Sequence, residues 1–253
     1  MSVLIVNYHR TESDPSNAAG HVISDSEFDE QIRLIQSHEL PVISAAQLCD
    51  PADRDPAPRI GFTFDDGAKS DLQNALKLSR LGWSATFFVS TCNIAKPGYL
   101  DGAEIKELAA MGMSVGSHSH MHTRLTRLPA PIAEANLRQS REILEDLLGT
   151  MIDRLAFPGG AYSREVLQLS MQNGFRYYFG TAWGVNRGRH VIARRVFRRN
   201  NIIHRMKIDD YRNIVTLNHY WQRQTKYMVR SAAAALLPER IYGQVRRLVT
   251  KSG

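Results

Sequence analysis

The sequence has few cysteines and no long apolar run. Its two cysteines, Cys49 and Cys92, form no Cys-x-x-Cys pair, so there is no cysteine-based zinc or redox motif and no need for an oxidising compartment. No run of 18 apolar residues is present, which argues against a transmembrane helix. The N-terminus, MSVLIVNYHR, has no basic segment before its short apolar run, so we expect a first β-strand there and not a signal peptide. These absences favour a cytoplasmic protein.

Compositional bias is also absent. Hydrophobic residues make up 43% of the 253 positions and charged residues 23%, which excludes a disordered chain, a collagen and a coiled coil. There are no internal repeats and no low-complexity linker. A chain of about 250 residues is long enough to form one α/β barrel.

Acidic residues are scarce in the last quarter of the chain. Residues 187–253 contain 16 Lys and Arg against 3 Asp and Glu, whereas residues 1–186 contain 16 against 22. We therefore predict a barrel over residues 1–207 and a basic helical extension over 208–253, packed on or beside it. A basic block of this kind typically faces a polyanion or an anionic membrane surface, and the alternative is a solvated basic face. Nucleic acid is not an expected partner.

The end of this extension has the pattern of an interfacial helix. Residues 222–253 hold seven basic residues and one acid, and apolar residues recur there at helical spacing: Leu237, Ile241, Val245 and Leu248. This pattern predicts peripheral contact with the anionic inner face of a membrane. The alternative is that the apolar stripe packs on the barrel.

Short apolar runs alternate with helical patterns along the rest of the chain. The predicted strands are Val3–Tyr8, Arg59–Phe64, Ala85–Val89, Ser114–Gly116, Leu155–Phe157 and Tyr177–Thr181. The predicted helices are one with Ser26 as its N-cap, then 70–81, 101–111, Pro131–Leu148 and Arg164–Asn173. Such alternation indicates a parallel sheet with helices outside it, and the length favours a closed or distorted (β/α) barrel.

Two adjacent carboxylates, Asp65 and Asp66, follow the predicted strand Arg59–Phe64 and precede Gly67. Alternation along a strand sends them in different directions, so one can ligate a metal while the other remains free as a base. The C-terminal ends of strands are where parallel α/β folds place their chemistry. The alternative is an Asp-Asp-Gly turn that caps the following helix.

Three histidines lie within five residues in the segment GSHSHMH. His118 and His122 are four residues apart, and one helical turn would put both imidazoles on one face, as a divalent metal requires. His120 would point elsewhere. One Asp and two His with an open fourth position describe a hydrolytic metal centre.

A third segment, Leu155-Ala156-Phe157-Pro158-Gly159-Gly160, runs from a strand into a turn. Pro158, Gly159 and Gly160 would let the backbone approach a ligand closely, although by itself the segment is only a turn. Trp183 follows a later strand and is a candidate flat wall for a sugar or an acetyl methyl, with a core position as the alternative.

These three segments, TFDDG, GSHSHMHTRL and AFPGG in that order, resemble the first three motifs of the polysaccharide deacetylases (NodB homology domain, carbohydrate esterase family 4). The resemblance covers roughly residues 3–200. It implies a distorted (β/α) barrel and a metal-dependent N-deacetylase that usually uses zinc.

Carried over by position, the resemblance assigns Asp65 as the general base and Asp66, His118 and His122 as ligands of one divalent ion, with zinc expected. The backbone amide of Gly159, at a position where the family often has Tyr, would help to hold the oxyanion. Many members have an Arg two residues before the third-motif Pro, in contact with the catalytic Asp, and here that residue is Ala156. Arg195 is therefore expected to orient Asp65.

The general acid is harder to assign, because no clear Leu-x-His motif occurs late in the chain. His204 and His219 are the nearest matches, but neither follows a convincing strand. In the circularly permuted biofilm-polysaccharide branch of the family, a Tyr-His near the N-terminus supplies the acid, and Tyr8-His9 resembles that element. His9 ends an apolar run that can deliver it to the rim of a barrel, so we predict that His9 protonates the leaving amine.

The resulting prediction is an enzyme: a metal-dependent N-deacetylase of an amino sugar in a polysaccharide or lipid-linked glycan, located in the cytoplasm or at the inner face of the membrane. One alternative keeps the fold and acts on small non-sugar amides or imides. Another is a catalytically silent glycan-binding domain, which the intact base and ligand set argue against.

Overall fold

The computed structural model describes residues 2–15, 20–49, 57–187, 196–218 and 225. Contacts divide the chain into two compact units, Met1–Ile208 and Asp209–Gly253. The second unit contributes α8 (Ile208–Val215), and the interfacial helix predicted within residues 222–253 lies outside the described residues apart from position 225. No helix in the described part of the chain is both long and apolar enough to cross a membrane.

The first unit is built on one large sheet whose strands follow the order β10-β8-β7-β6-β5-β4-β1-β11, with β9 pairing antiparallel to β1. Every other pairing in this sheet is parallel. Its strands are β1 (Ser2–Tyr8), β4 (Pro58–Asp66), β5 (Ala85–Val89), β6 (Ser114–Ser117), β7 (Arg154–Ala156), β8 (Tyr177–Phe179), β9 (Val185–Arg187), β10 (Val196–Phe197) and β11 (Asn200–Asn201). A separate parallel pair consists of β2 (Arg10–Glu12) and β3 (Val22–Ser24).

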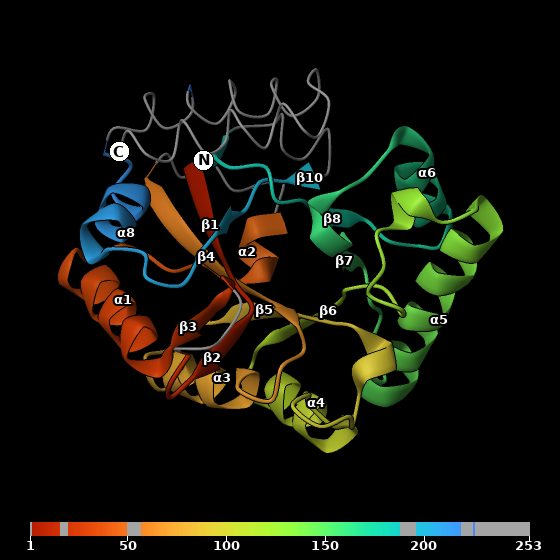
Figure 1. The fold of residues 1–253 in the computed structure, drawn as a ribbon, viewed down its shortest axis with the longest axis horizontal. Coiled ribbons are helices and arrows are strands. Elements are labelled where there is room, and N and C mark those ends of the chain that lie inside the picture. The colour runs from red at the N-terminus through yellow and green to blue at the C-terminus, as the bar shows by residue number, and fades with distance from the viewer. Residues whose placement is uncertain (1, 16–19, 50–56, 188–195, 219–224, 226–253) are drawn as a thin grey trace. The chain divides into compact units, whose positions relative to one another are not determined.

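The two ends of the sheet order, β10 and β11, are consecutive in the chain. Only Arg198 and Arg199 separate them, so the backbone itself passes from one edge of the sheet to the other (Figure 1). The sheet is therefore curled into a nearly closed barrel, the distorted (β/α) barrel expected from the alternation of elements.

The barrel is surrounded on its outside by α1 (Asp25–Ser37), α3 (Asp71–Arg80), α4 (Gly102–Ala110), α5 (Ala130–Leu148) and α6 (Arg164–Gln172) (Figure 1). Helix α2 (Ala45–Cys49) is different, because its Leu48 and Cys49 pack with the hydrophobic residues inside the barrel. Short 3₁₀ turns are η1 (Thr91–Asn93), η2 (Leu125–Arg127) and η3 (Pro158–Gly160). The N-cap of α1 is Ser24 and not the predicted Ser26, because Ser24 and Glu27 form a reciprocal capping box. Helix α5 ends at Gly149, whose left-handed φ of 66° suits glycine.

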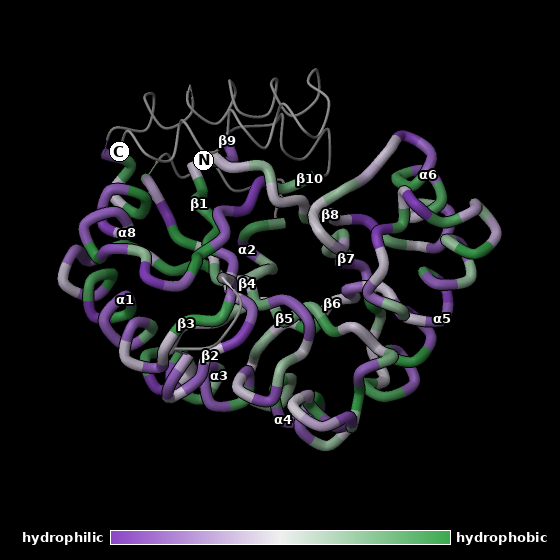
Figure 2. The backbone as a smooth tube through the Cα atoms, in the orientation of Figure 1, coloured by the Kyte–Doolittle hydropathy of each residue, from purple (hydrophilic) through white to green (hydrophobic). Residues whose placement is uncertain are grey.

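The core lies between the strands and the inner faces of the helices. Strand β1 is buried from Val3 to Tyr8 and is mostly hydrophobic in Figure 2, as expected of a strand that is covered on both faces. Phe88, Phe179 and Phe197 pack together inside the barrel. A parallel sheet covered in this way places all its strand C-termini at one rim, which is where the polar clusters of the sequence gather.

Candidate active site

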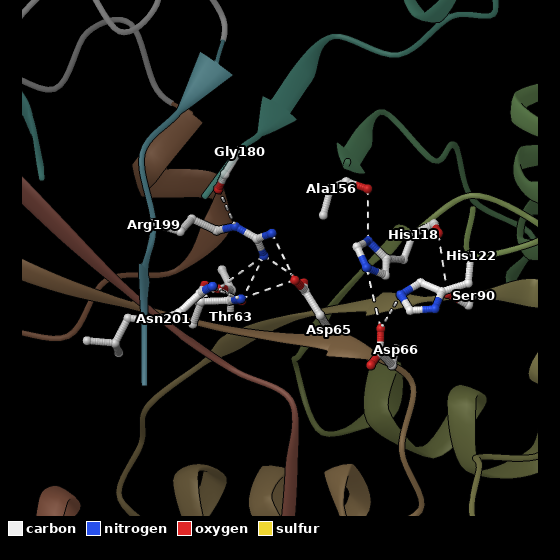
Figure 3. Close-up of polar contacts among 12 residues, drawn as sticks. Thr63, Asp65, Asp66, Ser90, His118, His122, Ala156, Gly180, Arg199 and Asn201 are labelled. Carbon is white, nitrogen blue, oxygen red and sulfur yellow. Dashed lines mark hydrogen bonds and ion pairs between the residues drawn. The ribbon is translucent and has the colours of Figure 1, made fainter. Parts of the chain in front are cut away.

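Strand β4 runs two residues beyond its predicted end and includes both Asp65 and Asp66. The two carboxylates turn to different partners: Asp65 faces Arg199, and Asp66 faces the two histidines (Figure 3). Asp66 has a left-handed φ of 81° and is followed by Gly67, also left-handed at 74°, so the strand ends abruptly at the rim. Positive φ at a non-glycine residue is a costly conformation that functional sites often contain.

Asp65 is held by a buried arginine that the sequence analysis did not single out. The two terminal guanidinium nitrogens of Arg199 donate to Asp65, Nη1 to Oδ1 at 2.6 Å and Nη2 to Oδ2 at 2.9 Å. Arg199 is completely buried, and it also donates to the carbonyl of Gly180 and to Oδ1 of Asn7. Asn7 Nδ2 donates in turn to Asp65 Oδ2 at 3.1 Å.

This network keeps Asp65 ionised. Burial raises the pKa of Asp65, but the charge of Arg199 and the Arg199 hydrogen bonds lower that pKa well below its usual value. A bidentate arginine also fixes the orientation of the carboxylate plane. Asp65 is therefore a carboxylate of fixed position and fixed charge on the wall of the site.

The interaction expected of Arg195 is thus made by Arg199. Arg195 itself lies outside the described residues. The signal in the sequence is the run Arg198-Arg199-Asn200-Asn201, but only the closure of the barrel shows which of its arginines faces Asp65.

Asp66, His118 and His122 form a cluster suited to a divalent cation. The candidate ligand atoms of the three residues all lie within 4.8 Å of one another. Asp66 Oδ1 is 3.4 Å from His118 Nε2 and 2.9 Å from His122 Nε2. His118 Nδ1 contacts the carbonyl of Ala156 at 2.9 Å, which leaves Nε2 free to ligate. The donor set fits zinc, because two imidazoles and one carboxylate with an open position form a common catalytic zinc site.

The local structure that brings the two histidines together differs from the predicted one. His118 and His122 do not lie on a helical turn; they belong to a loop after β6, with left-handed φ values of 64° at Ser119 and 52° at His122. The loop is held by Asn136 of α5, whose Oδ1 accepts hydrogen bonds from the backbone of His120 at 2.7 Å and of Met121 at 3.0 Å.

The pKa values of the two histidines are shifted in opposite directions. Burial lowers the pKa of His118 in spite of the nearby Asp65 and Asp66, which keeps the imidazole neutral as a ligand must be. The hydrogen bond to Asp66 raises the pKa of the more exposed His122. His120 is not part of the cluster, since its Nδ1 contacts the hydroxyl of Thr91 at 2.9 Å.

A cavity of about 480 Å³ opens over these residues, a volume within the usual range of small-molecule sites. Asp65 and the three members of the cluster line it together with two further histidines. His9 follows β1, as the sequence suggested, and its Nδ1 is buried without a hydrogen-bond partner. Burial lowers the pKa of His9, and Asp65 and Asp66 act in the opposite direction.

His21 is a further histidine of the cavity that the sequence pattern did not single out. Its ring stacks on that of His9 with centroids 4.7 Å apart, and it lines the same cavity. His204, a second candidate acid, does not line the cavity; it lies beside Glu27 and Arg205. His219, the third candidate, lies outside the described residues.

The Pro-Gly-Gly turn contributes one residue to the lining of the cavity. Gly159 lines it, whereas Pro158, Gly160 and Trp183 are not among the lining residues. Pro158 is buried, and a side chain at Gly160 would clash with Thr181, so these two residues shape the turn. Trp183 is half-buried, and its carbonyl accepts a hydrogen bond from Arg198.

Comparisons of the sequence with known proteins identify relatives of this chain. The sequence profile of a family described as "Polysaccharide deacetylase" matches residues 52–178, half of the chain. A curated relative, YxkH of Bacillus subtilis (strain 168), whose name places it among the polysaccharide deacetylases, is 24% identical over 176 residues. The match covers 68% of this chain and 62% of YxkH, so the chain spans less than two thirds of that relative's length.

Solved structures share the fold. The deacetylase PplD of Streptococcus pyogenes, in complex with acetate, superposes with a TM-score of 0.77 at 19% identity and covers 85% of this chain and 98% of its own. IcaB from Ammonifex degensii gives a TM-score of 0.73 at 19% identity and covers 85% of this chain and 96% of its own. At these identities the likeness concerns the fold alone.

Proposed function

Because this chain belongs to the polysaccharide deacetylase family, we propose that it is a zinc-dependent hydrolase that removes the N-acetyl group from an amino sugar of a polysaccharide or lipid-linked glycan. One observation carries the proposal: the oriented carboxylate of Asp65 and the Asp66–His118–His122 cluster line the same cavity. Hydrolysis of an unactivated amide needs a base, a site for the developing negative charge and an acid for the amine, and the cavity offers a residue for each role.

Asp66, His118 and His122 would hold the ion. When bound, a divalent ion supplies Lewis-acid polarisation of the amide carbonyl and makes water a stronger nucleophile. Asp65 then accepts the proton of the attacking water at a carboxylate oxygen. Arg199 and Asn7 hold that carboxylate in place, so Asp65 needs no reorientation during the reaction.

The backbone amide of Gly159 is proposed to donate to the oxyanion that forms on the acetyl carbonyl. His9 is proposed to give a proton to the sugar nitrogen, since an amide nitrogen leaves only when it is protonated. His9 suits this role because it lines the cavity together with Asp65 and the Asp66–His118–His122 cluster. The stacked ring of His21 limits its motion.

Release of acetate and metal content together test the proposal. We expect the purified protein to contain about one zinc per chain and to release acetate from N-acetylglucosamine oligomers. His118→Ala should lose both the metal and the activity. Asp65→Asn should keep the metal and lose turnover by about 10²–10⁴-fold, because it removes a base and not a ligand.

His120→Ala is the matched control, since His120 lies in the same loop and bonds Thr91 instead of the cluster. It should retain the metal. Full metal occupancy in His118→Ala would reject the ligand assignment, and a near-normal rate in Asp65→Asn would move the base to another residue.

A further inference from the structure

Two arginines line the cavity, and each lies across a glycine in the left-handed region. A Cβ at Gly98 would lie 2.8 Å from Nη2 of Arg10, and a Cβ at Gly159 would lie 2.8 Å from Nε of Arg124. With each guanidinium in this position, a side chain at the facing glycine would have to displace it, and the left-handed φ of 83° at Gly98 and 63° at Gly159 also favours glycine. The two arginines differ, however, in whether an acidic side chain neutralises them.

Arg10 has a carboxylate partner, because its Nε contacts Oε1 of Glu12 at 3.1 Å. No such partner is present for Arg124: among the residues that the structure describes, no carboxylate forms an ion pair with it. Neither acid that lines the cavity is free for this role. Asp65 is engaged by Arg199, and Asp66 is contacted by His118 and His122. Arg124 therefore offers an unneutralised positive charge at the open side of the cavity, where it is exposed.

Arg124 lies next to Gly159, whose backbone amide is proposed to hold the oxyanion. Its side chain occupies the space that a side chain at residue 159 would fill, directly beside the backbone amide proposed to hold the oxyanion. Arg124 thus places a positive charge where a side chain at residue 159 would otherwise lie. A guanidinium presents a planar fork of donors that matches the oxygens of a phosphate or a carboxylate.

We propose that Arg124 is a specificity-determining residue that binds an anionic group, a phosphate or a carboxylate, on the substrate close to the N-acetyl group that is removed. This inference rests on the proposed deacetylase function and narrows its substrate to an acidic amino-sugar glycan. An exposed guanidinium would favour acidic substrates when they bind. Because salt screens the attraction between exposed charges, this preference should weaken as the salt concentration rises.

Three substrates that differ only beside the acetamido sugar test this. They are a neutral N-acetylglucosamine disaccharide, the disaccharide with glucuronic acid in place of the second sugar, and N-acetylglucosamine 1-phosphate. For each, kcat/KM is measured as acetate release at two salt concentrations. We expect the wild type to prefer at least one acidic substrate by about tenfold or more at low salt, the scale of one charged hydrogen-bonded contact. Preference for the phosphate or for the carboxylate would identify which group is bound.

Arg124→Gln should reduce that ratio to about one, and Arg124→Lys should retain part of it, since the charge remains while the fork is lost. Arg127→Gln is the matched control: Arg127 is exposed in the same segment and does not line the cavity, so the ratio should be unchanged. Equal losses on acidic and neutral substrates in Arg124→Gln would overturn the inference, because Arg124 would then contact hydroxyl groups or support the fold. A wild type without charge preference would also overturn it.

Failure of the proposed function is a separate outcome. If the wild type releases acetate from none of the three substrates, the deacetylase proposal fails. Calorimetric binding of N-acetylglucosamine 1-phosphate still tests Arg124 in that case. Weaker binding to Arg124→Gln than to Arg127→Gln supports the anion site, and equal binding rejects it.

Discussion

Two buried aspartates illustrate how burial alone does not decide ionisation. Asp65, at the end of β4, and Asp71, at the start of α3, lie close in sequence, but among the described residues a cation is bonded to Asp65 and none to Asp71. The charge of Arg199 keeps the Asp65 carboxylate ionised, whereas burial raises the pKa of Asp71 more than the backbone hydrogen bond from Ala68 lowers it. A buried carboxyl without a cationic partner favours its neutral form.

Asp71 should therefore make stability depend on pH. Burial, and then the charge of Asp66, raise the pKa of Asp71 well above that of the unfolded chain. The folded state then holds a proton that the unfolded state releases, so stability falls as pH rises above about 4. Asp71→Asn should remove this loss and be more stable than the wild type by about 1 kcal/mol or more at pH 8.

Urea denaturation from pH 4 to pH 8, with a chelator present, measures this difference. The exposed carboxylate of Asp146 provides the control variant Asp146→Asn, which should follow the wild type. A difference between Asp71→Asn and the wild type that stays constant with pH would contradict the explanation.

His9 can be tested through the leaving group. If His9 protonates the departing nitrogen, His9→Ala should keep the metal and lose the alkaline limb of the rate–pH profile on an acetamido sugar. An activated phenyl acetate ester should suffer much less, because its leaving group needs no proton. His21→Ala serves as the comparison, since it removes only the ring that stacks on His9. Equal losses on both substrates in His9→Ala would show that another residue protonates the leaving nitrogen.

At the scale of elements, a loop and not a helix joins the two histidines of the cluster. The loop after β6 reaches this shape through left-handed residues, and such a conformation persists only where neighbouring groups hold it. Helix α5 provides that support through Asn136, which accepts two backbone hydrogen bonds from the loop. Nδ2 of Asn136 has no partner, so the acceptor oxygen carries the interaction.

Asn136→Ala should therefore weaken zinc binding by about 10–100-fold, the usual effect of removing a group that positions ligands. Competition with a chromophoric chelator measures the affinity. Asn136→Asp is the matched variant, because it keeps an acceptor oxygen for the two backbone N–H groups and adds one negative charge; it should bind zinc at least as tightly as the wild type. If Asn136→Ala binds zinc as tightly as the wild type, the loop holds its shape without the helix.

At the scale of the whole molecule, the chain combines a mildly acidic first part with a strongly basic last quarter. Most of that basic segment lies outside the described residues, so its role rests on composition. We propose that it contacts an anionic membrane surface, where a lipid-linked substrate would be reached.

Reversing two charges in the full chain tests this proposal. Arg246→Glu combined with Arg247→Glu should weaken binding to phosphatidylserine-containing vesicles, measured by co-sedimentation, by about 30-fold or more, given about 1 kcal/mol for each basic residue near such a surface. The pair Arg127→Glu and Arg164→Glu makes the same change in net charge on exposed residues of the first unit and should have little effect. Equal reductions in both pairs would show a general effect of net charge.

Some features followed from the sequence alone because they depend on local patterns. Alternating apolar and helical segments determined the parallel barrel, and most predicted elements lie within a few residues of the observed ones. Polar residues at strand ends indicated where Asp66, His118 and His122 would gather, since parallel strands end at one rim.

The tertiary structure alone decided the remaining contacts of the site. Arg199 faces Asp65 across 134 positions of sequence, and it does so because the chain joins the two edges of the sheet at that point. His21 stacks on His9, and Arg124 lies across Gly159, through contacts between separate loops. No local propensity specifies such pairs. They arise when closure of the barrel brings loops together, and small differences in strand length then determine which neighbouring side chain faces inward.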